Sequence, residues 1–437
     1  MAGLAVMAGC KDKHSEPAEP ATPGNTVENV YEAECRWIYG QMNRNYLWRE
    51  DLPDSLNCDY LLPPHAFFNN LLSPKDRFSY IELNNGYSPP ASDYGFEYQP
   101  FIDNMGDLYW QVLYVRPAIR QRFGIKRGEF VKPLNRTANT LTLRRGEFLD
   151  NRFVARAVCS IEAVVSDVHN STVLLDSIYE IGGKRIGYLC YLKFDRTEDL
   201  EPALTRFAEE HIDELILDLR YNPGGFIDTS LFLSNAIVTP NGYGQLFQRL
   251  SYNNVLSASY RLRTGDECTY SYFDDPTDRT RLRSHEPISL GIERLVVLTS
   301  KYTASASEAT VIALRPFMPV VIIGERTVGK GVGSWTVSDS RYKYKLHPII
   351  FRYWNAASET TPDDGLAPDI EINGGYYTPG EELGNLNEPL LAAAITSVTG
   401  YAAHHNNIKR VGHKPAGLVP AGEPSFVTTF KQMNYEL

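Results

Sequence analysis

The chain has 437 residues, of which 43% are hydrophobic and 12% aromatic, and it carries a formal net charge of -10 at pH 7. This length exceeds what one hydrophobic core usually supports, so we expect about three globular domains. The negative charge, with no basic stripe, disfavours nucleic-acid binding. The six cysteines include no Cys-x-x-Cys pair and the nine histidines form no His-Glu-x-x-His pattern, so we expect neither a metal site nor a cofactor.

The composition of residues 1–25 predicts the remnant of an export signal followed by a flexible tether. Residues 1–9 are small and apolar, and the run from Met7 to Cys10 resembles the end of a bacterial lipoprotein signal, where the cysteine takes the lipid. Residues 11–26 are rich in Pro, Glu, Ala and Lys, a composition that cannot bury a core. We therefore expect a protein of the bacterial cell envelope, on the periplasmic side or the surface, whose only membrane contact is a lipid on Cys10.

The next two domains differ in their periodicity. Apolar residues recur at helical spacing from Val30 to Tyr46, and a second helical stretch covers residues 66–72. These patterns predict a small helical N-terminal domain over residues 26–85. Residues 86–176 are mostly strand-like with glycines as punctuation, which predicts a β-rich domain.

From Ile186 onward, apolar strands alternate with helical segments. This alternation predicts right-handed crossovers and a largely parallel sheet covered by helices, in an α/β domain over residues 177–400. Residues 243–285 lack a clear period and are interpreted as a hairpin insertion. Residues 401–437 are a polar tail to which the sequence assigns no function. The fold class is thus mixed α/β and multidomain.

Ser305 lies between an apolar strand, residues 295–298, and a helical run that stops before Pro316. Open α/β sheets usually carry their sites beyond the carboxyl ends of strands, and the free amides of a helix start can hold an oxyanion. A serine here is therefore a candidate nucleophile. An ordinary N-cap, with Glu308 closing a capping box, explains the same spacing, and the two interpretations are not exclusive.

Lys330 follows Ser305 by 25 residues, behind a buried strand and among glycines. A serine needs a base, and a lysine serves as one only when it is neutral, a form that burial favours. Taken alone, Lys330 is a solvated turn residue. Residues 324–330 also match the start of a phosphate-binding P-loop, but Gly331 stands where that motif needs Ser or Thr, and a strand-like segment follows instead of a helix.

A third segment is a buried strand, residues 214–220, that breaks at Tyr-Asn-Pro-Gly-Gly, residues 221–225. Bare backbone amides at such a turn are suited to stabilising the charge of a tetrahedral intermediate. An ordinary strand-to-helix turn explains the pattern equally well.

In this order, residues 217–225, 303–308 and 324–331 resemble the C-terminal processing (tail-specific) peptidases. The resemblance implies a ClpP/crotonase-like core and a Ser-Lys dyad without a cofactor. It also implies that the substrates are polypeptides, either unfolded or C-terminal segments. The roles that it implies are Ser305 as nucleophile, Lys330 as base, Glu308 as the residue that holds the dyad, and an oxyanion hole formed by the amide of Ala306 and that of Gly224 or Gly225.

The resemblance also implies a PDZ-like domain that captures peptides. Tyr94, Gly95 and Phe96 are similar to its carboxylate loop, although Glu129 replaces the usual Asp of a later turn. A catalytically silent or gated peptide-binding envelope lipoprotein is the alternative function, and a nucleotide-binding protein is the third. No sequence feature specifies an oligomeric state.

Overall fold

The structure is a computed structural model that describes residues 31–84, 94–137, 140–162, 171–276, 287–373, 381–400 and 417–427. Cys10 and the expected tether lie outside these described residues. Within them, no helix is both long and apolar enough to cross a membrane.

A six-stranded sheet in the order β18-β13-β12-β9-β8-β7 forms the centre of the molecule. All neighbouring strands pair in parallel except β7 and β8, which are antiparallel. The predicted α/β core with a largely parallel sheet is therefore confirmed. The strands are β7 (Val173–Ile181), β8 (Lys184–Tyr191), β9 (Glu214–Asp218), β12 (Leu295–Thr299), β13 (Val320–Gly324) and β18 (Ile370–Glu371).

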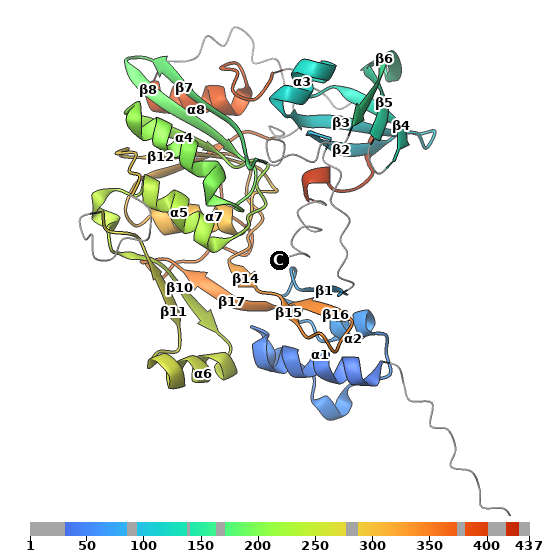
Figure 1. The fold of residues 1–437 in the computed structure, drawn as a ribbon, viewed down its shortest axis with the longest axis vertical. Helices are drawn as coiled ribbons and strands as arrows, with labels where there is room; N and C mark the ends of the chain where they lie inside the picture. The colour runs from blue at the N-terminus through green and yellow to red at the C-terminus, as the bar shows by residue number, and fades with distance from the viewer. Residues whose placement is uncertain are drawn as a thin grey trace, which may run out of the picture.

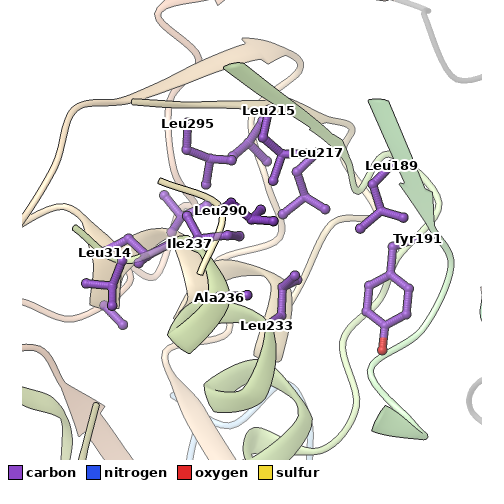
Figure 2. Packing of buried hydrophobic residues seen from close by; sticks show 14 of the residues in the cluster. Leu189, Tyr191, Leu215, Leu217, Leu233, Ala236, Ile237, Leu290, Leu295 and Leu314 are labelled. Carbon is purple, nitrogen blue, oxygen red and sulfur yellow. The ribbon is translucent and has the colours of Figure 1, made fainter. Parts of the chain in front are cut away.

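Helices cover both faces of this sheet because its strands are apolar on both sides. Leu215 and Leu217 of β9 pack in one core with α4 (Thr197–Glu209), α5 (Ile227–Ile237) and α7 (Ala306–Leu314), as Figure 2 shows in part. Ile216, between them, packs in a second core with α8 (Pro389–Thr399). Successive strand residues point to opposite faces, so an unbroken apolar run gives a strand buried on both sides.

A second sheet, in the order β11-β10-β17-β14, extends from the lower edge of the core. The described part of the predicted insertion contributes two of its strands, with a helix between them rather than a simple hairpin. The elements are η3 (Pro240–Gly242), β10 (Leu246–Tyr252), α6 (Asn254–Thr264), β11 (Thr269–Tyr272), β14 (Val332–Ser334) and β17 (Ile349–Trp354).

The N-terminal region is helical as predicted, but its core is shared with the expected α/β domain, residues 177–400. Ile81 and Leu346 are buried in the same cluster as the helices, and β1 pairs with β16. These strands belong to a three-stranded sheet in the order β1-β16-β15, and Figure 1 shows the helices beneath it. The elements are α1 (Glu32–Asn45), η1 (Arg49–Asp51), η2 (Ser55–Asn57), α2 (Pro64–Asn70), β1 (Tyr80–Leu83), β15 (Val337–Ser338) and β16 (Tyr344–His347).

The β-rich domain contains a sheet in the order β19-β2-β3-β4-β5-β6 with helix α3 packed on it. One edge strand of this sheet, β19, comes from the C-terminal tail, to which the sequence assigned no function. β7 belongs to the central sheet, so this domain ends before Val173. The elements are β2 (Phe96–Ile102), β3 (Leu108–Val115), α3 (Pro117–Phe123), β4 (Phe130–Arg136), β5 (Thr140–Leu149), β6 (Arg152–Glu162) and β19 (Val419–Pro420).

Candidate active site

Ser305 occupies the turn between β12 and α7, at the carboxyl end of the central sheet. Its backbone has φ 57° and ψ -117°, a conformation that L residues rarely adopt, and its side chain is partly exposed. Such a conformation costs about 1–3 kcal/mol and persists where the surrounding structure enforces it, which is common at functional sites. A strained serine between a strand and a helix is also the geometry that presents a nucleophilic hydroxyl in a nucleophile elbow.

Glu308 connects the Ser305 turn to the loop that carries Lys330. Its fully buried carboxylate accepts hydrogen bonds from the amides of Ser305 (2.9 Å), Lys330 (2.8 Å) and Gly329 (2.7 Å) and from the Thr327 hydroxyl (2.5 Å). Burial raises the pKa of Glu308, and these four donors oppose the rise. One carboxylate therefore sets the separation of the two loops.

Lys330 follows β13 and is half-buried. Its Nζ lies 5.4 Å from the centre of the Phe78 ring. Burial lowers the pKa of Lys330, while the negative charges of Glu308 and Asp76 act to raise it. A lysine with a lowered pKa has a larger neutral fraction at a given pH, which is the form that accepts a proton.

Residues 76–78 of the N-terminal region form a turn beside Lys330. Arg77 donates hydrogen bonds to the carbonyls of Gly329 (3.1 Å) and Asp363 (2.7 Å), which fixes the Lys330 loop. Asp76 accepts from the Phe78 amide (2.8 Å), so the Phe78 ring is held over the lysine. Sequence reasoning missed these contacts, since the only local signal was a helix break near Pro74.

Gly224 lies directly against Ser305. A Cβ on Gly224, whose φ is 109°, would lie 2.8 Å from the Ser305 Cβ and 3.0 Å from the Ala306 nitrogen, so only glycine permits this approach. The Gly224 amide donates to Asn222 Oδ1 (2.9 Å). Within the described part of the chain, the amides of Gly225 and Ala306 donate to no acceptor, so they are the ones available to a substrate.

The residues expected to capture peptides lie at the start of strand β2, with Tyr94 and Gly95 directly before it and Phe96 as its first residue. The side chains of Tyr94 and Phe96 are buried in the core of the β-rich domain, and the Tyr94 hydroxyl donates to the Thr137 carbonyl (3.1 Å). The Gly95 carbonyl accepts from the Arg116 amide (2.8 Å). Their side chains therefore support the fold, and only the backbone of this strand is suited to contacting a peptide.

Residues 324–330 lack the helix that a nucleotide-binding P-loop requires after it. The chain after Lys330 forms strand β14, whereas a P-loop must lead into a helix whose N-terminus faces the phosphates. In the described ranges, no three His, Cys, Asp or Glu side chains converge as metal ligands.

Together, a strained serine at the end of a parallel strand and a half-buried lysine in the adjoining loop define a candidate serine hydrolase. Residues 185–372 match peptidase family S41, and residues 33–80 match the peptidase S41 N-terminal domain. The chain belongs to peptidase family S41, which includes the C-terminal processing peptidases.

Three relatives illustrate the similarity. The chain is 28% identical to the tail-specific protease of Haemophilus influenzae over 206 residues, which are 44% of this chain and 25% of that protein. It is 25% identical to the carboxyl-terminal-processing protease of a Picosynechococcus species, over 46% of this chain and 45% of that protein. It is 26% identical to the carboxy-terminal processing protease CtpA of Bacillus subtilis, over 47% of this chain and 39% of that protein. The chain therefore spans less than half the length of these curated relatives.

A solved structure covers more of the chain. The crystal structure of a Bacteroides fragilis protein assigned to the S41 proteases superposes with a TM-score of 0.69 at 25% sequence identity. The match covers 83% of this chain and 97% of that one, so the likeness includes more than the catalytic sheet.

Proposed function

We propose that this chain is a serine endopeptidase of the C-terminal processing type, with Ser305 as the nucleophile and Lys330 as the general base. The observation that carries the proposal is the Glu308 carboxylate, which binds the backbones of both residues and so joins the two loops. Membership of a peptidase family and the lowered pKa of Lys330 support it.

The reaction begins with the neutral amine of Lys330 taking the proton of Ser305 while its Oγ attacks the carbonyl carbon of the scissile peptide bond. The resulting oxyanion accepts hydrogen bonds from the amides of Ala306 and Gly225. The ammonium of Lys330 then returns its proton to the leaving amine, which departs and leaves an acyl ester on Ser305. Water, deprotonated by Lys330, hydrolyses that ester by the same two steps. Removing one oxyanion donor from such a site typically slows turnover by a factor of about 10²–10³.

The proposed substrates are unfolded or C-terminal polypeptide segments in the bacterial cell envelope, with Cys10 as the lipid anchor. The printed names of the relatives, which refer to tail-specific and carboxyl-terminal processing, support this substrate class. A silent or gated peptide-binding lipoprotein is the alternative function.

Cleavage of casein, an unfolded protein, tests the proposal. Wild type and a Ser340→Ala control, whose serine is exposed and lies outside the site, are expected to cleave it, while Ser305→Ala does not. A fluorophosphonate probe is expected to label the first two proteins only. Folded wild type and Ser305→Ala proteins that both leave casein intact would favour the alternative.

The pH dependence of cleavage is expected to report Lys330. Since the base must be neutral, kcat/KM falls as the pH drops through the pKa of Lys330, which burial places below the usual lysine range. Asp76→Asn removes a negative charge that raises this pKa, so the variant is expected to keep activity to a lower pH. The measurement is kcat/KM from about pH 6 to about pH 10 for both proteins. A fall of kcat/KM whose pKa lies in the ordinary lysine range would contradict the assignment of Lys330 as the base. A fall whose pKa is the same in wild type and Asp76→Asn would contradict it as well.

A further inference from the structure

The outer edge of β2 is covered by the chain's own C-terminal segment, residues 417–427, here called the C-terminal strap. Its strand β19 pairs antiparallel with β2, with Val419 opposite Ile102 and Pro420 opposite Phe101. Figure 1 shows the strap in red beside the β-rich domain. Tyr94 and Gly95 directly precede β2, and Phe96 is its first residue, so the covered edge is that of the strand that follows the residues expected to capture peptides.

Two polar contacts of the strap use its backbone, as any extended peptide could, and two use the side chain of Ser425, where the strap becomes helical over residues 425–427. The Ala421 amide donates to the Pro100 carbonyl (3.0 Å), and the Gln99 side chain donates to the Gly422 carbonyl (2.7 Å). Ser425 adds a side-chain contact, because its hydroxyl accepts from the Tyr98 amide (2.7 Å) and donates to the Glu97 carboxylate. Main-chain bonding of this kind gives affinity in β-strand addition without fixing the sequence of the added strand.

Two buried apolar side chains anchor the strap at its ends. Leu418 is 2% exposed and packs with Phe101, Tyr109 and Phe130 of the β-rich domain. Phe426 is 6% exposed and makes edge-on ring contacts with Tyr221 (5.6 Å) and Tyr302 (5.5 Å).

The position of Phe426 connects the strap to the candidate active site. Tyr221 directly precedes the Asn-Pro-Gly-Gly turn, and Tyr302 lies three residues before Ser305. The strap therefore follows β2 and ends beside both segments that frame the nucleophile.

We propose that the β2 edge, together with Tyr221 and Tyr302, is a polypeptide-binding site that the C-terminal strap occupies in cis, extended along β2 and helical at Phe426, and that an incoming polypeptide binds there by replacing the strap. The identity of that polypeptide as a substrate rests on the proposed function. A ligand held on the same chain acts at an effective concentration on the order of mM, so a free peptide competes poorly until the strap is released.

Fluorescence anisotropy with a labelled peptide of residues 417–427 tests this inference. The full chain carries Ser305→Ala so that the peptide is not cleaved, and it is compared with the same chain bearing Leu418→Asn and Phe426→Asn, which release the strap. The release variant is expected to bind the peptide with a Kd about tenfold lower or more, because its own copy no longer competes. A peptide with the same two changes is expected not to bind. The control is Val419→Thr, at a strap position that is 60% exposed, and it is expected to leave Kd unchanged.

An equal or higher Kd in the release variant would show that the strap is a fixed strand of the domain, and would overturn the inference. Ser425→Ala is the second variant, since it removes only the hydroxyl contacts to Tyr98 and Glu97 and is expected to fold if the release variant does not. It is expected to lower Kd about threefold and to speed hydrogen exchange at the Tyr98 amide. No change in either quantity would also overturn the inference.

Casein cleavage by chains that retain Ser305 separates this inference from the proposed function. Peptide exchange that depends on the strap, without cleavage by wild type or the release variant, refutes the enzyme and supports the binding site. Cleavage together with a Kd that is independent of the strap keeps the enzyme and refutes the binding site.

Discussion

Lys330→Ala is expected to abolish casein cleavage as completely as Ser305→Ala, and the double variant is expected to be no less active than either single one. Nucleophile and base act as a unit, so losing either removes the same catalytic contribution, on the order of 10⁴–10⁶ in kcat. The measurement is the initial rate of fluorescein-casein cleavage, with the thermal midpoint confirming that each variant is folded. Losses that multiply in the double variant would show that the two residues act independently.

Lys330→Arg distinguishes a base from a packing or charge role. The guanidinium retains the positive charge and can still lie over the Phe78 ring, but it is not deprotonated in proteins. A general base at this position therefore requires the Arg variant to be as inactive as the Ala variant. The matched control is Lys343→Ala, at an exposed lysine of the same region, which is expected to leave the rate unchanged. A Lys330→Arg protein with more than about a tenth of wild-type activity would contradict the dyad.

Local sequence patterns predicted the elements around the site. The run before Ser305 forms β12 and the run after it forms α7, because an unbroken apolar stretch gives a doubly buried strand and small residues before an apolar run favour a helix start. The Pro-Gly-Gly turn after β9 allows Gly224 to approach Ser305 through the absence of a Cβ. The strand, the helix and the glycine turn each depend on residues close in sequence, whereas the contact between Gly224 and Ser305 joins two distant segments.

Contacts between distant segments could not be predicted in the same way. Arg77 donates to Gly329 across 252 residues of sequence, and nothing near Arg77 indicates that partner. The C-terminal strap has neither helical nor strand periodicity, and its two-residue strand forms because β2 offers an unpaired edge. The N-terminal helices share a core with Leu346, which an assignment of domains along the sequence separates from them.

The second large effect is expected in stability, from a buried charge cluster at the end of β9. Arg220 is fully buried and pairs with Asp218 (2.8 Å) and with Glu388 (2.6 Å). Glu388 also caps α8 by accepting from the Leu391 amide (3.0 Å). The cluster therefore links the end of β9, which leads into the turn at Asn222, to the start of helix α8. This helix packs on the face of the sheet opposite to α5 and α7.

Arg220→Met is expected to lower the free energy of unfolding by about 3–5 kcal/mol, because it leaves two carboxylates buried without their main counter-charge. Arg127, 3.8 Å from Glu388, compensates only in part. Urea denaturation followed by tryptophan fluorescence measures the loss. The control is Arg156→Met, which breaks an exposed ion pair with Glu147 and is expected to cost about 0–1 kcal/mol. A loss at Arg220 no larger than the loss at Arg156 would contradict this account.

The pH dependence of that loss tests its cause. In the wild type, burial acts to raise the pKa of Glu388, but the Arg220 charge holds it below the usual value, so the ion pair contributes stability above the unfolded pKa and loses it as the pH falls. In Arg220→Met, a carboxylate buried without its counter-charge has a raised pKa, and its ionisation opposes folding as the pH rises. Both effects have the same sign, so the difference between wild type and Arg220→Met is expected to be larger at about pH 8 than at about pH 5. A difference that is constant with pH would assign the loss to packing of the long Arg220 side chain rather than to its charge.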